Sequence, residues 1–154
     1  MIYFWRKTVG LLAMSTCVVA APPVGFERTV VDGDFSQVVG VTPMGDGRSL
    51  AFECGGIVWV IGEDGVASEY PFLDIHDEVL AYRDHGLLSV VVDPLFFENG
   101  YVYALYAVDP HHLHLFGTPD YSPWITWTDR ASIGRLTRYQ ATQASDFSIV
   151  DPSS

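Results

Sequence analysis

The stretch RDHGLLSVVVDPLFFENGYVYALYAV, from Arg83 to Val108, decides the fold class of this chain. It holds two runs of β-branched and aromatic residues, LLSVVV and YVYALYAV, and the residues between them include Asp–Pro and Asn–Gly. Side chains of this kind fit a pleated strand, whereas Pro and Asn–Gly favour a change of chain direction. The stretch therefore predicts a β-strand, a turn and a second β-strand.

An earlier segment, VVGVTPMGDGRSLAFECGGIVWVI from Val38 to Ile61, has the same order of features. Each unit contains an apolar strand, a turn marked by Pro and Gly, an aromatic strand and a further strand, which in the second unit is ASIGRLTRYQ from Ala131 to Gln140. The units begin about 50 residues apart, and a four-stranded unit with a period of about 40–50 residues is typical of a β-propeller blade. We therefore predict an all-β fold, a partial β-propeller of about two blades.

Two finer expectations follow from the blade pattern. The continuous apolar run Leu87–Val92 predicts an innermost strand that is buried on both faces. The segment FERTVV, Phe26–Val31, predicts an outer strand that belongs to the last blade and closes the ring. The dipeptide Gly55–Gly56 predicts a tight hairpin turn, because glycine adopts positive φ angles without steric cost.

The interval 109–130, DPHHLHLFGTPDYSPWITWTDR, interrupts the second unit and predicts a long loop between its second and third strands. His111, His112 and His114 allow two interpretations of this loop. They could supply ligands to a metal ion, although no cysteine accompanies them and the sequence indicates no distant partner. Alternatively, the aromatic residues of the loop pack over the end of the propeller.

Residues 1–20 are expected to be a secretory signal peptide. Arg6 and Lys7 supply its positive charges, and the apolar stretch that follows is too short to span a bilayer. The stretch ends in small residues at Ala20, and we predict cleavage there. The mature protein is therefore expected to be secreted or periplasmic, without membrane insertion. An alternative is a lipoprotein signal with Cys17 as the lipidated residue. Thr16 disfavours it, because the residue before such a cysteine is usually smaller than threonine.

The chain is strongly acidic, with 8 Lys and Arg against 19 Asp and Glu. Loss of the signal removes Arg6 and Lys7, and the remaining 6 basic and 19 acidic residues give a net charge of −13. Such a surface repels phosphate backbones and anionic lipid headgroups, so nucleic acid is not an expected partner. Cys54 then has no cysteine to pair with, and we interpret it as a half-buried structural thiol rather than a reactive one.

Three segments, at 46–61, 84–108 and 133–140, resemble the glucose/sorbosone dehydrogenase family. The specific part of the resemblance is Gly–Leu–Leu at 86–88, Asp–Pro–x–Phe at 93–96 and Asn–Gly–Tyr–Val–Tyr at 99–103. The resemblance spans about Phe26 to Tyr139. It implies a secreted six-bladed β-propeller that uses pyrroloquinoline quinone (PQQ) and calcium to oxidise a hydroxyl of a sugar or alcohol.

The resemblance also implies that this chain is an N-terminal fragment that is inactive alone. Six blades of about 50 residues need roughly 300 residues. In the family, the general base is a histidine preceded by Asp in the blade after the RLTRY-like sequence, and the quinone-binding arginines and calcium ligands come later still. The resemblance therefore places no catalytic residue in this chain, and we expect the fragment to bind neither PQQ nor calcium.

One residue, Asp84, is a candidate for facing the cofactor or the substrate, because it occupies the position of a glutamine in well-known members of the family. Its carboxylate could accept a hydrogen bond from a sugar hydroxyl or repel an anionic quinone, or it could only satisfy backbone N–H groups at the entry to a strand. We expect His85 to point into the interface between blades. Ser89 stands where the family pattern has glycine, which brings a hydroxyl into a crowded strand.

Two other functions stay open. The chain could belong to a secreted binding propeller without catalysis, or it could be a metal-binding fragment that acts through the loop His111–His114. In each case an incomplete ring exposes the flank of its last blade, an apolar face with open strand edges. We therefore expect self-association through this flank and poor solubility of the isolated chain.

Overall fold

The computed structural model describes residues 21–26, 28 and 30–151. The predicted signal peptide, residues 1–20, lies outside the described residues. The helices in the described part of the chain are short, and none of them is long and apolar enough to cross a membrane. Cleavage near Ala20 and secretion therefore stay predictions.

The first sheet is antiparallel, and its strands follow the order β1–β2–β3–β4. The strands are β1 (Val38–Pro43), β2 (Ser49–Glu53), β3 (Ile57–Ile61) and β4 (Leu73–Asp74). The predicted hairpin turn at Gly55–Gly56 joins β2 to β3. Glycine is required at Gly56, because its φ is +96° and a Cβ would lie 2.9 Å from Val79 Cγ2.

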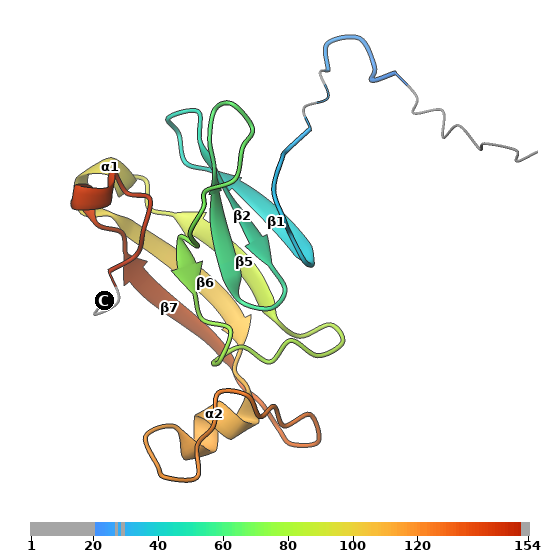
Figure 1. Cartoon of the computed structure of the whole chain (residues 1–154), viewed down its shortest axis with the longest axis vertical. Helices are drawn as coiled ribbons and strands as arrows, with labels where there is room; N and C mark the ends of the chain where they lie inside the picture. The colour runs from blue at the N-terminus through green and yellow to red at the C-terminus, as the bar shows by residue number, and fades with distance from the viewer. Residues whose placement is uncertain (1–20, 27, 29, 152–154) are drawn as a thin grey trace, which may run out of the picture.

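The second sheet is also antiparallel and has the order β5–β6–β7 (Figure 1). The strands are β5 (Leu87–Val92), β6 (Tyr101–Ala107) and β7 (Gly134–Gln140). A short helix, α1 (Phe96–Asn99), lies between β5 and β6, and the 3-10 helix η1 (Gln143–Ser145) follows β7. The strand, turn and strand that the opening stretch predicts are therefore confirmed.

The connection between β5 and β6 is organised by the carboxylate of Asp93. Its Oδ1 accepts hydrogen bonds from the backbone N–H of Leu95 (2.9 Å) and from Asn99 Nδ2 (3.0 Å). Its Oδ2 accepts a hydrogen bond from the Tyr103 hydroxyl (2.9 Å). The Asp–Pro and Asn–Gly–Tyr–Val–Tyr parts of the sequence pattern therefore build this turn.

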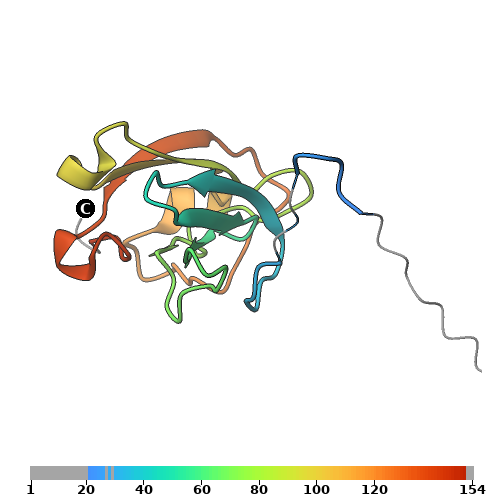
Figure 2. The ribbon, with the colours of Figure 1, turned by 90° about the horizontal axis from the view of Figure 1, so that it is seen from above.

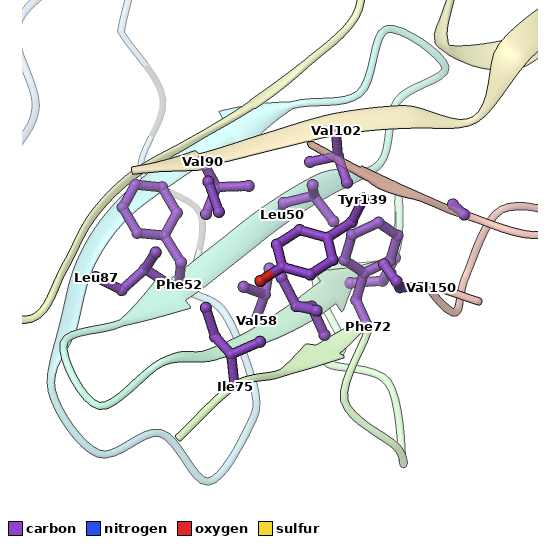
Figure 3. Close-up of a cluster of buried hydrophobic side chains, with 14 of the residues drawn as sticks. Leu50, Phe52, Val58, Phe72, Ile75, Leu87, Val90, Val102, Tyr139 and Val150 are labelled. Atoms are coloured by element: carbon purple, nitrogen blue, oxygen red, sulfur yellow. The ribbon is translucent and has the colours of Figure 1, made fainter. Parts of the chain in front are cut away.

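The two sheets stack face to face, and the hydrophobic core lies between them (Figure 3). Strands β1 and β2 contact β5, and the Thr42 hydroxyl donates a hydrogen bond to the Val90 carbonyl oxygen (2.6 Å). In β6, alternate side chains point into this layer, as the pleat requires, whereas in β5 an irregularity between Leu87 and Ser89 breaks the alternation. The core side chains include Leu50, Phe52 and Val58 from the first sheet and Leu87, Val90, Val102 and Tyr139 from the second.

The opposite face of the second sheet is not covered by the described part of the chain. Its apolar residues are Leu88, Val91, Leu105 and Leu136, which we call the open face; Leu88 is 51% exposed and Leu136 is 68% exposed. Burial of β5 on both faces was expected and is wrong, because no further sheet lies over Leu88 and Val91. Two antiparallel sheets that do not close into a barrel agree with the predicted partial β-propeller.

The outer strand expected at Phe26–Val31 is not formed by the described residues of that segment. Phe26, Val30 and Val31 are exposed, and Figure 2 shows residues 21–26 leading away from the two sheets. Next to this segment, Asp32 forms a single parallel bridge to Val66. An extended segment becomes a strand only when it hydrogen-bonds to a free edge. The last blade, to which this strand was predicted to belong, is not among the two described sheets.

A short helix, α2 (Pro110–Leu115), occupies the start of the interval 109–130, where a loop without regular structure was expected. The Asp109 carboxylate accepts a hydrogen bond from the His111 backbone N–H (2.7 Å), and Pro110 takes the first helical position. Both features favour the start of a helix. The interval nevertheless lies between the second and third strands of its sheet, as predicted.

Candidate functional site

The end of the two sheets that carries α2 also carries the turn with Asp84 and His85, whereas α1 lies at the opposite end (Figure 1). Two backbone hydrogen bonds hold that turn in place. The Leu87 N–H donates to the Cys54 carbonyl oxygen (2.9 Å). The Ala107 N–H donates to the Gly86 carbonyl oxygen (3.0 Å). The turn is therefore tied both to the first sheet and to β6.

Asp84 and His85 are exposed in this turn. The His85 Nδ1 lies 3.0 Å from the Tyr82 carbonyl oxygen, so the ring folds back onto its own turn. The expectation that His85 points between the blades is therefore wrong. Within residues 21–26, 28 and 30–151, no group hydrogen-bonds to or ion-pairs with the Asp84 carboxylate. Asp84 therefore does not cap the entry to β5, and its charge is available to a ligand.

The glycine of the Gly–Leu–Leu pattern is required by a close contact. Gly86 has a φ of +127°, and a Cβ there would lie 2.5 Å from Cys54 Sγ. The Cys54 thiol donates a hydrogen bond to the His85 carbonyl oxygen (3.3 Å) and is half-buried. This contact agrees with the interpretation of Cys54 as a structural thiol. Ser89, at the position of a family glycine, directly follows an irregularity in the pairing of β5 with β6.

A polar network connects β6 and β7 of the second sheet to Glu78, which lies in the segment before β5. The Tyr106 hydroxyl donates a hydrogen bond to Glu78 Oε1 (2.7 Å), and Arg135 forms an ion pair with the same oxygen. The Tyr106 hydroxyl also lies 3.0 Å from Thr137 Oγ1 and 3.4 Å from the Tyr139 hydroxyl. Burial raises the pKa of Tyr106 and of Tyr139, so both hydroxyls stay protonated at neutral pH.

Arg135 is held charged in this network. Burial lowers the pKa of its guanidinium. The hydrogen bond with Tyr106 and the negative charge of Glu78 raise this pKa by more than burial lowers it, so the net pKa is above the ordinary value. Arg135 and Glu78 therefore form a fixed pair of opposite charges, with side chains that are 35% and 16% exposed.

Two histidines of α2 are buried in an aromatic cluster. The His111 ring stacks on Tyr121 at 5.4 Å between ring centroids and meets Trp127 edge to face at 5.0 Å. The His112 ring stacks on Phe116 at 4.5 Å between centroids. This arrangement agrees with the interpretation in which the loop is held by aromatic packing.

The structure gives less support to the metal-site interpretation. Among the described residues, no group of three or more His, Cys, Asp or Glu side chains could hold a metal ion. His114 is exposed, and His111 is buried with an Nδ1 that has no hydrogen-bond partner in the described part of the chain. The histidines of α2 therefore do not come together as a ligand set.

Tyr121 joins the loop to the turn before the second sheet. Its hydroxyl lies 3.0 Å from His112 Nδ1 and 3.2 Å from Asp77 Oδ2. Burial and the negative charge of Asp77 raise the pKa of Tyr121 to about 12, so the hydroxyl is protonated at neutral pH. Because the Asp77 carboxylate can only accept, Tyr121 donates to it.

A hollow of about 510 Å³ opens between α2, the turn at Asp77 and the start of β7. We call it the α2 hollow, and its lining residues are Asp77, Glu78, His112, Leu113, Phe116 and Arg135.

The sequence pointed to one residue of the α2 hollow, His112, and missed its charged residues. Glu78 and Arg135 are far apart along the chain, and a single sequence does not show that they pair. One signal was present: Tyr106 occupies an inward-facing position of β6, and a buried tyrosine hydroxyl needs a polar partner.

No model of a known protein family matches the sequence, and no curated protein matches it. Solved structures do match the fold. The PQQ-bound form of an aldose sugar dehydrogenase from Streptomyces coelicolor is similar to 76% of this chain, with 16% identity and a TM-score of 0.51. The soluble aldose sugar dehydrogenase from Escherichia coli, in its apo-form, is similar to 73% of this chain, with 17% identity and a TM-score of 0.50.

The chain spans 28% of the length of the first of these proteins and 26% of the length of the second. At such low identity the likeness shows the fold alone. That fold is a partial β-propeller of two stacked sheets, which has the arrangement of part of a sugar dehydrogenase.

Proposed function

We propose that this chain is the N-terminal portion of a secreted, PQQ-dependent sugar dehydrogenase-like protein. The observation that carries the proposal is the likeness of its two sheets to part of two aldose sugar dehydrogenases. The sequence pattern in β5, α1 and β6 supports it. With its ring of blades complete, the protein would oxidise a hydroxyl of a sugar or alcohol. The signal-like composition of residues 1–20 supports secretion or a periplasmic location.

The described residues do not fit PQQ or calcium by themselves. Calcium takes about 6–8 oxygen ligands, and no group of three or more ligand side chains occurs in the described part of the chain. In sugar dehydrogenases the quinone accepts the hydride that leaves the sugar carbon. We derive no such step for this chain and propose that it is inactive alone.

Asp84 is the residue that we assign to substrate. It lies exposed immediately before β5, the strand that the blade pattern places nearest the propeller axis. A carboxylate without a protein partner can accept hydrogen bonds from sugar hydroxyls. Asp84 would therefore orient a sugar.

The coding sequence beyond codon 154 tests the proposal. We expect it to encode further blades in frame, with an Asp–His pair in the blade after β7. Further blades without that pair would contradict an enzyme and support the alternative, a secreted binding propeller without catalysis. The purified chain should reduce no dye when supplied with PQQ, calcium and glucose. Dye reduction that depends on both PQQ and glucose would contradict the proposed inactivity.

The metal-binding alternative has its own test. The exposed ring of His114 and the unpartnered Nδ1 of His111 are the two observations that favour it. Zinc or copper titration of the chain and of a His111→Ala/His114→Ala variant would decide, because unchanged affinity would end this alternative.

We also propose that the open face becomes buried by association with another sheet. Leu88, Val91, Leu105 and Leu136 are exposed apolar residues on one side of a three-stranded sheet. Exposed apolar surfaces of this kind lower their free energy by association. In the isolated chain the partner would be a second copy, whereas in a longer protein it would be the next blade.

A further inference from the structure

The α2 hollow has one apolar wall that is held in a fixed orientation. Phe116 is 65% exposed, yet its ring is stacked on His112 and meets Tyr121 edge to face at 5.3 Å. Tyr121 is in turn hydrogen-bonded to His112. The exposed phenyl ring is therefore backed by a rigid aromatic layer, unlike an isolated surface phenylalanine.

The polar rim of the hollow is also fixed. Glu78 is anchored by the Tyr106 hydroxyl and by Arg135. Asp77 accepts a hydrogen bond from Tyr121. Carboxylate oxygens have several acceptor positions, and a guanidinium has five N–H donors, so these groups keep capacity for further hydrogen bonds. The hollow thus offers acceptors and donors around an exposed aromatic ring.

The charge of the hollow selects among ligand classes. Glu78 neutralises Arg135, which leaves Asp77 as the uncompensated charge, so an anionic ligand is disfavoured. A metal ion is disfavoured because the described residues provide no set of three ligands. A neutral ring with an apolar C–H face and a rim of hydroxyls satisfies both the aromatic wall and the polar rim.

We propose that the α2 hollow binds a neutral pyranose, with the sugar ring stacked on Phe116 and its hydroxyls bonded to Asp77, Glu78 and Arg135. The choice of a sugar rests on the proposed function, whereas the site does not include Asp84 or any quinone ligand. It would therefore act as a second sugar-binding position at the same end of the propeller as the turn with Asp84.

Saturation-transfer NMR with methyl β-D-glucopyranoside tests this proposal on the full chain. We expect saturation transfer to the C–H protons of the sugar, and weaker binding by about tenfold in Phe116→Ala and in Phe116→Leu. Trp124→Ala is the matched control, because Trp124 is an 84% exposed aromatic residue of the same loop that does not line the hollow. D-glucuronate should bind more weakly than the neutral glycoside.

Several outcomes would overturn the proposal. These are absence of saturation transfer, equal losses in the Phe116 and Trp124 variants, full affinity in Phe116→Leu when its circular dichroism is unchanged, or tighter binding of glucuronate. The probe has no free anomeric hydroxyl and the assay contains no PQQ, so binding does not depend on oxidation. Failure of the proposed enzyme activity would leave this result unaffected, and failure of binding would leave the proposed activity standing.

Discussion

The Tyr103 hydroxyl donates a hydrogen bond to Asp93 Oδ2 over 2.9 Å and so joins the residue after β5 to the middle of β6. Asp93 also receives hydrogen bonds from Leu95 and Asn99. The most specific part of the sequence pattern is thus a structural device that fixes the turn between two strands of a blade. The pattern therefore indicates the fold, and the chemistry of the protein depends on other residues.

Asp93 should make the stability of the chain depend on pH in acid. Hydrogen bonds from the Leu95 backbone and from the Asn99 side chain lower the pKa of Asp93 below its ordinary value of 3.8. The stabilisation is therefore present above the unfolded pKa and is lost as the pH falls through the lower native pKa. We expect Asp93→Asn to lower the Tm at neutral pH and to flatten the loss of stability below about pH 4.

Thermal melts followed by circular dichroism across the acid range measure this effect. Asp120→Asn is the control, because Asp120 is exposed and has no hydrogen-bond or ion-pair partner among the described residues. An acid profile of Asp93→Asn that matches the unmodified chain would contradict the role of the carboxylate.

Gly100 should tolerate a side chain much less well than Gly117. Both have left-handed backbones, with φ of +70° and +79°, but a Cβ at Gly100 would lie 2.3 Å from the Ala141 carbonyl oxygen, whereas Gly117 has open space. We expect Gly117→Ala to cost about 1 kcal/mol from the backbone alone and Gly100→Ala about 3 kcal/mol. Urea unfolding of both variants gives the comparison, and equal costs would show that the turn relaxes.

The Tyr106 hydroxyl should contribute more to stability than the Tyr139 hydroxyl. Tyr106 is hydrogen-bonded to Glu78 over 2.7 Å, whereas the contact of the Tyr139 hydroxyl with Tyr106 is 3.4 Å long. Tyr106→Phe should cost about 1–3 kcal/mol, and Tyr139→Phe about 0.5–1 kcal/mol. Urea denaturation at neutral pH would measure both, and the reverse order would refute the assignment of Tyr106 as the centre of the network.

Tyr121 should lose its proton at a pH well above the ordinary tyrosine value. Its pKa of about 12 results from burial first and the charge of Asp77 second. A raised pKa stabilises the fold below the unfolded value near 10, and this contribution is lost as the pH rises toward 12. Ultraviolet titration of Tyr121→Phe should lack one tyrosine ionisation that the unmodified chain shows near pH 12. An unchanged titration curve would contradict the contact with Asp77.

The strands could be predicted from the sequence because their inward-facing residues and turn residues are local signals. Val102, Ala104 and Tyr106 of β6 alternate into the core, and Asn99–Gly100 ends α1 with a left-handed residue. Helix α2 had a local signal too, the pair Asp109–Pro110, but the helix is only six residues long. So short a helix lacks the repeat that reveals longer ones.

The site could be predicted only in part, because its main contacts join distant parts of the chain. Arg135 and Glu78 are 57 positions apart, and Tyr121 and Asp77 are 44 positions apart. Phe26–Val31 has the composition of a strand, but pairing decides whether a strand forms, and that depends on an edge elsewhere. Single-sequence patterns report local preference and not such pairing.

The central claim is that two blades are present and that the open face belongs against another sheet. Sedimentation velocity of the chain and of Leu136→Asp tests it most directly, with Val24→Asp as the control, because Val24 is fully exposed in the N-terminal segment away from the open face. We predict that the chain and Val24→Asp sediment as dimers or larger species, and that Leu136→Asp shifts toward a monomer. A compact monomer of the unmodified chain that melts cooperatively would contradict the account.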